Sequence, residues 1–151
     1  MNQDVIAIAA DHAGFALKAM LVGDLRAGGH DVLDLGTADG ERSVDYPDFG
    51  RAVADAIASG RAARGVVVCG SGIGISIAAN RNPAVRAALC TSGLMARLAR
   101  MHNDANVLAL GSRIIGIEVA RDCLHEFMTT PFAGGRHAAR VDKLSLQEAY
   151  S

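Results

Sequence analysis

The stretch from residue 65 to residue 80, GVVVCGSGIGISIAAN, limits the fold of this chain more than any other segment. It opens with three consecutive valines, a β-branched apolar run that is typical of a strand buried on both faces. Glycines at 70, 72 and 74 follow at once, and from Ile73 the apolar residues recur at helical spacing, with Ser71 placed as a cap. The segment therefore predicts a strand, a glycine turn and a helix, which is a building unit of parallel α/β sheets.

Short apolar runs and segments of helical periodicity alternate in the same way along the rest of the chain. The predicted strands cover 5–10, 31–35, 66–68, 85–90 and 106–110, and the predicted helices cover 15–26, 45–58, 73–80, 94–101, 116–128 and 137–149. This alternation indicates a parallel sheet covered on both faces and joined by right-handed crossovers. We therefore expect a single domain over residues 1–151 with a three-layer α/β/α architecture: a doubly wound five-stranded parallel sheet in the flavodoxin-like or Rossmann-like order 2-1-3-4-5, followed by a C-terminal helix.

Sheets of this kind bind ligands beyond the carboxyl ends of their strands. The residues at those ends are Asp11-His12 after the first strand, 69–74 after the third and 111–113 after the fifth. His102-Asn103 instead precedes the fifth strand, which places it at the other edge of the sheet, far from Cys69 within one chain. A neighbouring subunit could bring it to the Cys69 cleft.

Cys69 lies where the central strand meets the glycine turn. Backbone N–H groups at the start of the following helix have no partner within it, and the helix dipole makes this place mildly positive. The place suits an oxyanion or an enediolate, and a thiol beside it ionises more easily. A reactive thiol and a small buried hydrophobe are both open interpretations of Cys69, whereas Cys90 and Cys123 are predicted to be packing residues.

The glycine turn matches neither of two common nucleotide-binding motifs. Counted from Gly70, the third glycine of G-x-G-x-x-G would fall on Ile75, and no Gly-Lys-Ser/Thr follows as in a Walker loop. A plain tight turn into a helix is the alternative interpretation. Two histidines in polar loops also have two possible interpretations. His12, beside Asp11, and His102, beside Asn103, are either functional groups or solvated surface residues.

Arg136 and Arg140 are four residues apart at the start of the last predicted helix, so both side chains point to one side. Such a pair suits a phosphate, which accepts bidentate hydrogen bonds, or forms a solvated basic face. A thiol base, an oxyanion-binding turn, a His/Asp pair and two arginines together describe proton transfer next to the carbonyl of a phosphorylated sugar. This chemistry needs no redox cofactor, metal or acyl-transfer triad.

Composition narrows the class of protein further. The formal net charge of the 151 residues is −1, which gives no electrostatic footprint for nucleic acid. No apolar run approaches the roughly 20 residues of a membrane span, and the first residues lack the basic and apolar regions of a signal peptide. The three cysteines have no C-x-x-C spacing, which favours a reducing, cytoplasmic setting without disulfides or a zinc site.

Six motifs, in order along nearly the whole chain, resemble the type B ribose-5-phosphate isomerases, whose family also includes allose-6-phosphate and galactose-6-phosphate isomerases. They are ADHAGF at 10–15, DYPD at 45–48, CGSGIGISIAAN at 69–80, HNDANVL at 102–108, GSR at 111–113 and GGRHxxR at 134–140. The resemblance implies a cofactor-free aldose–ketose isomerase of the pentose phosphate pathway that interconverts ribose 5-phosphate and ribulose 5-phosphate. It also implies a homodimer or a dimer of dimers with shared active sites, and we expect the last helix to pack at the dimer interface.

Catalytic roles follow from the same resemblance. Cys69 would move the proton between C1 and C2 through an enediolate, and His102 and Asp11 would open the furanose ring. The developing oxyanion would be held by the Ser71 hydroxyl and the turn formed by Gly70, Ser71, Gly72, Ile73 and Gly74. Some members lack the cysteine and place a glutamate on the following helix, but Ile75 and Ser76 stand there in this chain, which leaves Cys69 as the base.

Substrate-binding roles are also implied. The phosphate would be held by His12, Arg113, Arg136 and Arg140, and the partner chain would supply His102, Asn103 and Arg113. Two alternatives remain: an isomerase of six-carbon sugar phosphates, since pocket depth cannot be read from sequence, and a non-catalytic phosphosugar- or nucleotide-binding module of flavodoxin-like type. The second would explain the glycine turn and the arginines but gives no reason for Cys69 and His102.

Overall fold

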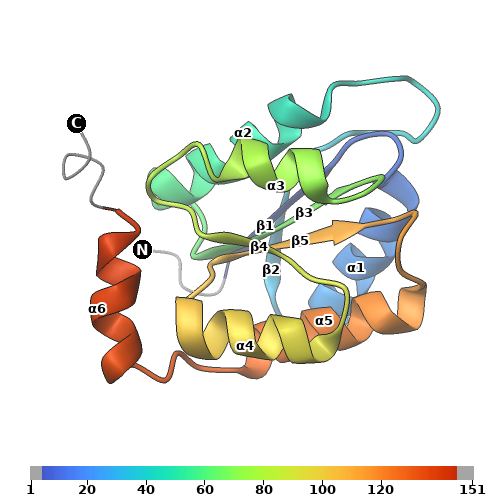
Figure 1. The fold of residues 1–151 in the computed structure, drawn as a ribbon. Helices are drawn as coiled ribbons and strands as arrows, with labels where there is room; N and C mark the ends of the chain where they lie inside the picture. Colours follow the sequence, from blue (N-terminus) through green and yellow to red (C-terminus); the bar gives the residue numbers. More distant parts are fainter. Residues whose placement is uncertain (1–4, 146–151) are drawn as a thin grey trace.

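The computed structural model of the protein describes residues 5–145, which form a five-stranded parallel sheet with helices on both faces (Figure 1). The strands are β1 Val5–Ala10, β2 Asp31–Asp34, β3 Arg64–Cys69, β4 Ala87–Leu89 and β5 Val107–Gly111, and the helices are α1 Phe15–Ala27, α2 Tyr46–Ala58, α3 Ile73–Ala79, α4 Gly93–Asn103, α5 Ile117–Thr129 and α6 Arg136–Lys143. The predicted three-layer α/β/α class is thereby confirmed. Among residues 5–145, none of the helices has the length and apolarity that crossing a bilayer demands.

The strand order is β2-β1-β3-β5-β4, which corrects the predicted order 2-1-3-4-5. β5 pairs with β3 in the interior of the sheet, and β4 pairs only with β5. The reason lies in burial: all five residues of β5 are buried, whereas β4 is three residues long and half-buried, shorter than the predicted 85–90. A short, partly covered strand is tolerated at a sheet edge, where one row of backbone groups has no partner.

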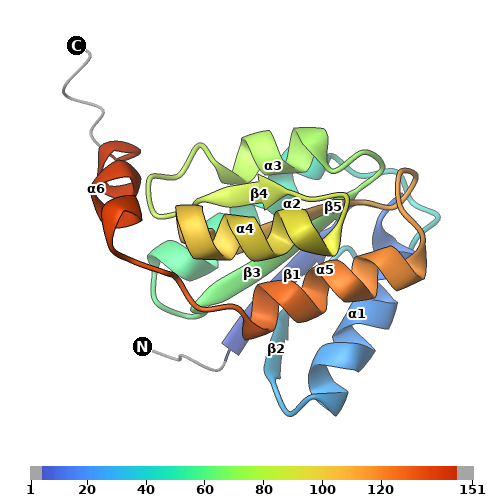
Figure 2. The ribbon, with the colours of Figure 1, turned by 60° about the horizontal axis from the view of Figure 1, so that its bottom comes forward.

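Alternating residues of the buried strands divide the core into two halves. In β3, Val66 and Val68 pack on the side of α1, α4 and α5, whereas Val67 and Cys69 pack on the side of α2 and α3 (Figure 2). Successive side chains of a strand point to opposite faces of the sheet, which explains this division. Cys69, the last residue of β3, therefore faces the helix layer that contains α3.

The C-terminal helix differs from its prediction over 137–149. α6 covers Arg136–Lys143 with Leu144 as its C-cap, and residues 146–149 of the predicted helix lie outside the described residues. α6 has no buried residue, and it lies beside the amino ends of the strands, at the end of the molecule opposite the tip of β5 (Figure 1). A helix without a buried face gains little stability from packing within its own chain.

A buried ion pair joins α1 to the end of β2. The ammonium group of Lys18 donates to Asp34 Oδ1 at 2.7 Å and to the carbonyl oxygen of Thr37 at 2.9 Å. The side chain of Lys18 is 3% exposed, whereas that of Asp34 is 38% exposed. If the ion pair were broken, water could therefore solvate the Asp34 carboxylate but not the Lys18 ammonium group.

We expect Asp34→Ala to lower the free energy of unfolding by about 2–3 kcal/mol, because it leaves a buried ammonium group without its counter-ion. Lys18→Met should cost only about 1 kcal/mol, because water solvates the half-exposed carboxylate and the methionine fills the space. Urea denaturation followed by circular dichroism measures both. Equal losses in the two variants would contradict the asymmetry that burial predicts.

Candidate active site at the carboxyl ends of the central strands

Cys69 ends β3 opposite Gly111 of β5, so its sulfur lies where the strand gives way to the glycine turn. The backbone N–H of Gly72 donates to Cys69 Sγ at 3.2 Å. The N–H of Ile73 donates to Ser71 Oγ at 3.1 Å. The turn therefore presents a thiol and a hydroxyl side by side, each already oriented by a backbone N–H.

Gly72, not Ser71, is the N-cap of α3. Its φ of 79° lies in the left-handed region. A Cβ there would stand 2.5 Å from Leu89 Cδ1 and 2.8 Å from the carbonyl carbon of Leu110. Ser71 satisfies the first helical N–H from the position before the cap, which corrects its predicted place while keeping its hydroxyl at the helix start.

We therefore expect Gly72→Ala to disrupt the turn. The variant combines left-handed strain of about 1–2 kcal/mol with the overlap of a methyl group against the backbone of β5, which adds roughly 1–3 kcal/mol. Thermal unfolding should show a lower midpoint, and activity should fall because the N–H on Cys69 moves. Gly60, with φ 80° and open space around its Cβ position, provides the control: Gly60→Ala carries the strain without the overlap.

A pocket of about 570 Å³ opens in front of Cys69 at the carboxyl ends of β1, β3 and β5. Its lining consists of Asp11, Tyr46, Cys69, Gly70, Ser71, Ile73, Gly74, Ile77, Arg113 and Ile114. Segments 58 and 44 residues away from Cys69 in the chain, around Asp11 and Arg113, thus meet the glycine turn in space. The structure brings together the three strand ends that the sequence predicted, and Cys69, although buried, is one of the residues that line this pocket.

Arg113 belongs to the same chain as the cysteine that it faces. Its backbone N–H donates to the carbonyl oxygen of Gly70 at 2.9 Å, and its guanidinium Nη1 lies 3.5 Å from where a Cβ on Gly70 would stand. Arg113 thus lies at the Cys69 pocket of its own chain, and the supply of the functional Arg113 by a partner chain stays a prediction. Beside it, Ser112 Oγ donates to the carbonyl oxygen of Ala13 at 2.8 Å, which joins the loops that follow β5 and β1.

Asp11 and His12 follow β1 but have different surroundings. Asp11 is buried, lines the pocket, and accepts the N–H of Gly14 on Oδ1 at 3.0 Å, so it also holds the turn before α1. His12 is half-buried, and its Nδ1 accepts the N–H of Val44 at 3.1 Å. Because Nδ1 accepts, a proton on the neutral ring lies on Nε2. His12 is outside the pocket lining and holds the loop before α2.

Tyr46 is a pocket residue that sequence reasoning missed. Its ring lies so close to Gly74 that a Cβ on that glycine would overlap it, and it lines the mouth of the pocket. The available signal was the DYPD motif at 45–48, which carried the family resemblance without a role for its tyrosine. Only the packing of α2 on α3 shows that the two motifs touch.

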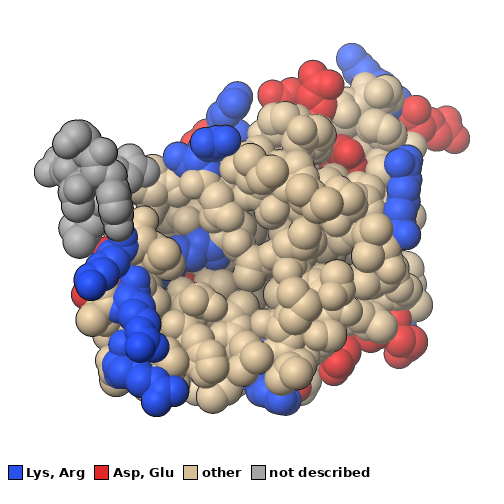
Figure 3. Space-filling view, viewed as in Figure 1, with Lys and Arg blue, Asp and Glu red and all other residues tan. Residues whose placement is uncertain are grey.

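His102, Asn103, Arg136 and Arg140 lie away from this pocket in the same chain. The first two occupy the last turn of α4, and the arginines lie on α6, near the amino ends of the strands (Figure 1). Figure 3 shows basic side chains gathered over this end of the molecule. His102-Asn103 is thus separated from Cys69 within one chain, as expected, and the two arginines share that separation.

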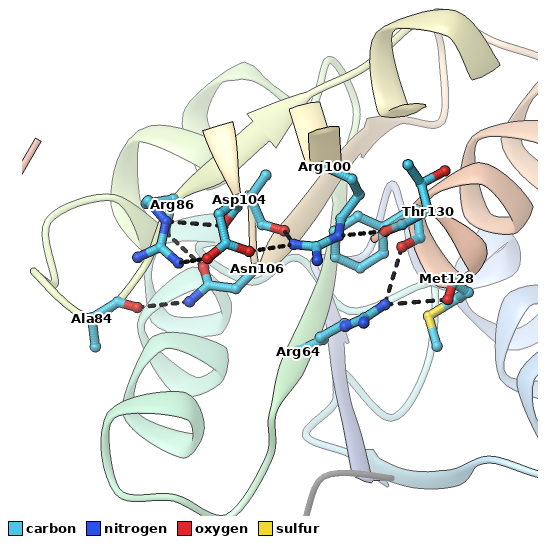
Figure 4. Close-up of polar contacts among 10 residues, drawn as sticks. Arg64, Ala84, Arg86, Arg100, Asp104, Asn106, Met128 and Thr130 are labelled. Atoms are coloured by element: carbon cyan, nitrogen blue, oxygen red, sulfur yellow. Dashed lines mark hydrogen bonds and ion pairs between the residues drawn. The ribbon is translucent and has the colours of Figure 1, made fainter. Parts of the chain in front are cut away.

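A network of ion pairs and hydrogen bonds holds the end of α4 (Figure 4). Asp104, the C-cap, adopts φ 46° and receives Arg100 Nη1 on Oδ1 at 3.0 Å and Arg86 Nη2 on Oδ2 at 3.3 Å. Asn106 donates to the carbonyl oxygen of Ala84 at 2.8 Å and accepts the N–H of Arg86 at 2.7 Å. The network fixes the backbone that carries His102 and Asn103. Asp104 lies in the HNDANVL motif at 102–108, from which the sequence alone predicted no role for the aspartate.

The other two cysteines differ from Cys69 in their surroundings. Cys90 and Cys123 are 1% and 0% exposed and belong to the core cluster on the α1, α4 and α5 side. Burial raises the pKa of Cys90 to about 12 and that of Cys123 to about 11. Both therefore remain neutral thiols at neutral pH, which agrees with their prediction as packing residues.

Fold and pocket together define a three-layer α/β protein with a glycine turn and a thiol at the carboxyl edge of its sheet. A sequence profile of the Ribose/Galactose Isomerase family matches residues 6–144. Ribose-5-phosphate isomerase B of Escherichia coli is 43% identical over 143 residues, which are 95% of each chain. The chain belongs to the ribose/galactose isomerase family.

Solved structures agree with this assignment. Ribose-5-phosphate isomerase B of Clostridium thermocellum superimposes with a TM-score of 0.94 at 50% identity, covering 97% of this chain and 99% of the other. The Mycoplasma genitalium isomerase, solved with bound ribulose 5-phosphate, superimposes with a TM-score of 0.92 at 38% identity and covers 97% of each chain. In both comparisons, the chain length and the fold correspond over nearly the entire protein.

Proposed function

We propose that this protein is an aldose–ketose isomerase that interconverts D-ribose 5-phosphate and D-ribulose 5-phosphate. The observation that carries the proposal is Cys69 Sγ, which receives the Gly72 N–H and faces a pocket with Arg113 on its wall. The relatives named ribose-5-phosphate isomerase B, one of them with bound ribulose 5-phosphate, support this function over one on six-carbon sugars.

In the proposed reaction, the Cys69 thiolate takes the proton from C2 of the open-chain aldose. The electron pair of that C–H bond forms the enediolate, and the negative charge develops on the oxygen at C1. Backbone N–H groups of the turn at 70–74 and the Ser71 hydroxyl donate to the enediolate oxygens, which stabilises charge that appears only during the reaction. The hydroxyl proton on the C2 oxygen moves to the C1 oxygen, so that the negative charge passes to the C2 oxygen. The Cys69 S–H then returns its proton to C1 while the C2 carbonyl forms, which yields the ketose and restores the thiolate.

The remaining groups support a shared site in a homodimer or a dimer of dimers. His102 opens the sugar ring with Asp11, and His12, Arg113, Arg136 and Arg140 hold the phosphate. His102 and α6 lie far from Cys69 within one chain. We therefore place His102, Asn103, Arg136 and Arg140 in the cleft of a partner subunit, with α6 packing at the interface. Exposed apolar side chains at the pocket mouth favour a covering subunit: Ile73 is 54% exposed, Ile77 51% and Ile114 60%.

The setting proposed for the enzyme is the cytoplasm, which the three free cysteines support. The chemistry itself uses only side chains and backbone groups of this chain, so we expect turnover to continue in EDTA. The test is direct: purified protein is assayed with ribose 5-phosphate, allose 6-phosphate and galactose 6-phosphate. Faster conversion of a six-carbon sugar would favour the alternative substrate class, and binding of ribose 5-phosphate without conversion would indicate a non-catalytic phosphosugar-binding module.

A further inference from the structure

His137 is the residue of the GGRH motif at 134–137 that the proposed reaction does not use. It lies in the first turn of α6, and its imidazole ring stacks on that of His102. The ring centroids are 4.4 Å apart and the planes are inclined by only 15°. Rotation of either ring about its Cβ–Cγ bond would break this contact, because flat rings at this spacing touch over their faces only while they stay parallel.

Two hydrogen bonds join the segment before α6 to the last turn of α4, beside the two rings. The N–H of Ala133 donates to the carbonyl oxygen of Met101 at 3.1 Å, and Arg100 Nε donates to the carbonyl oxygen of Thr130 at 3.1 Å. These bonds attach the segment before α6 to the last turn of α4, next to His102. The stack is therefore part of a fastened junction between two helices.

Two glycines direct the chain into this junction. Gly134 and Gly135 have φ values of 64° and 54°, a region that residues with a Cβ rarely adopt. The turn that they make lets α6 begin beside the end of α4, with Arg136 and His137 as its first residues. The glycines thus bring a phosphate-binding arginine and the stacking histidine to the same helical turn.

The charge state of His137 suits a supporting ring. Partial burial lowers the pKa of His137, and the charges of His102, Arg136 and Arg140 lower it further. A lowered pKa means that His137 is neutral near pH 7. A neutral ring stays in contact while His102 gains and loses a proton, because it adds no like charge to the pair.

We propose that His137 is a positioning residue: its ring fixes the plane of His102, so that the helix that binds the substrate phosphate also aims the ring-opening imidazole. This inference rests on the proposed function, in which His102 and Asp11 open the furanose. That step breaks the C1–O4 bond: one group donates a proton to O4, the other takes the proton of the C1 hydroxyl, and the electron pair of the O–H bond forms the C1 carbonyl. The direction of the donated proton depends on the plane of the ring that holds it.

The two substrates separate ring opening from proton transfer at carbon. Ribose 5-phosphate is cyclic and must be opened, whereas ribulose 5-phosphate is open-chain because its C5 oxygen carries the phosphate. Exchange of the C1 hydrogen of ribulose 5-phosphate with D₂O reports on Cys69 chemistry without ring opening. The experiment measures kcat and KM with ribose 5-phosphate, and this exchange rate, in His137→Ala and His137→Phe. His125→Ala, which removes an exposed histidine of α5, is the control.

We expect His137→Ala to lower kcat with ribose 5-phosphate roughly tenfold, a part of the about 10²–10⁴-fold that general acid–base catalysis contributes. KM and the exchange rate should remain within about twofold, because the arginines and Cys69 are untouched. His137→Phe keeps a flat ring on His102 and should restore most of kcat.

Three results would overturn the inference: an unchanged kcat in His137→Ala, an equal loss in the exchange rate, or a loss that His137→Phe does not restore. A rise in KM alone would also overturn it, because that result assigns His137 to phosphate binding. Failure of the proposed function itself has a different signature, since wild-type protein would then show neither turnover nor exchange. The two outcomes are therefore distinguishable within one set of measurements.

Discussion

Cys69→Ala should lower kcat for ribose 5-phosphate by roughly 10³–10⁴-fold, because it removes the only group proposed to carry the proton between C1 and C2. KM should change little, since the phosphate and sugar hydroxyl contacts come from other residues. The reason is structural: Cys69 lines the pocket and its sulfur receives a backbone N–H, and alanine leaves the pocket without this base. Steady-state assays in both directions measure the effect.

Cys90→Ala is the matched control, because it removes a thiol of the same size from the core on the opposite face of the sheet. It should lower stability while leaving kcat nearly unchanged. Near-normal turnover in Cys69→Ala would rule out the assigned base.

Alkylation provides a second measurement of the same prediction. The raised pKa values of Cys90 and Cys123, about 12 and about 11, keep these buried thiols neutral at pH 8, and only thiolates react readily with iodoacetamide. We expect one modified cysteine per chain, Cys69, and protection by ribose 5-phosphate. Modification of a core cysteine in the native protein would contradict the burial that the structure shows.

The second large effect concerns the division of the site between chains. Arg136→Ala/Arg140→Ala protein should lose roughly 10²-fold or more in kcat/KM, mostly through KM, because each charge-assisted hydrogen bond to phosphate contributes about 1.5–3 kcal/mol. Mixing this protein with Cys69→Ala protein should restore activity. In a mixed dimer, one site combines an intact Cys69 with intact arginines from the partner subunit. Random mixing in equal amounts makes half of the dimers mixed, so about a quarter of wild-type activity is expected.

The control for this experiment is a chain that carries all three substitutions. Mixed with Cys69→Ala protein it should restore nothing, because no site then has an intact Cys69 together with intact arginines. Absence of restoration in the first mixture, in dimers shown to have exchanged subunits, would mean that each chain uses its own arginines. Such a result would require α6 to leave its position beside α4, where two hydrogen bonds attach the preceding segment to α4.

Local pattern was enough to predict the units of the fold and one half of the candidate site. The valine run, the glycine turn and the periodicity after Ile73 predict strand, turn and helix, because propensity and side-chain period act over a few residues. Parallel strands end at a common edge, so the sequence also predicted that Asp11, Cys69 and Arg113 would meet. These inferences need chain direction and strand identity but no detailed packing.

Other features of the protein depend on contacts between segments far apart in the chain, and only the tertiary structure shows them. β5 rather than β4 lies beside β3, because a fully buried five-residue strand gains more from the interior than a half-buried three-residue one. The Tyr46 ring over Gly74 and the His102–His137 stack likewise follow from how helices and loops pack. The sequence by itself determined which groups are candidates for the chemistry. The packing of segments far apart in the chain determined which of those groups meet within a single chain.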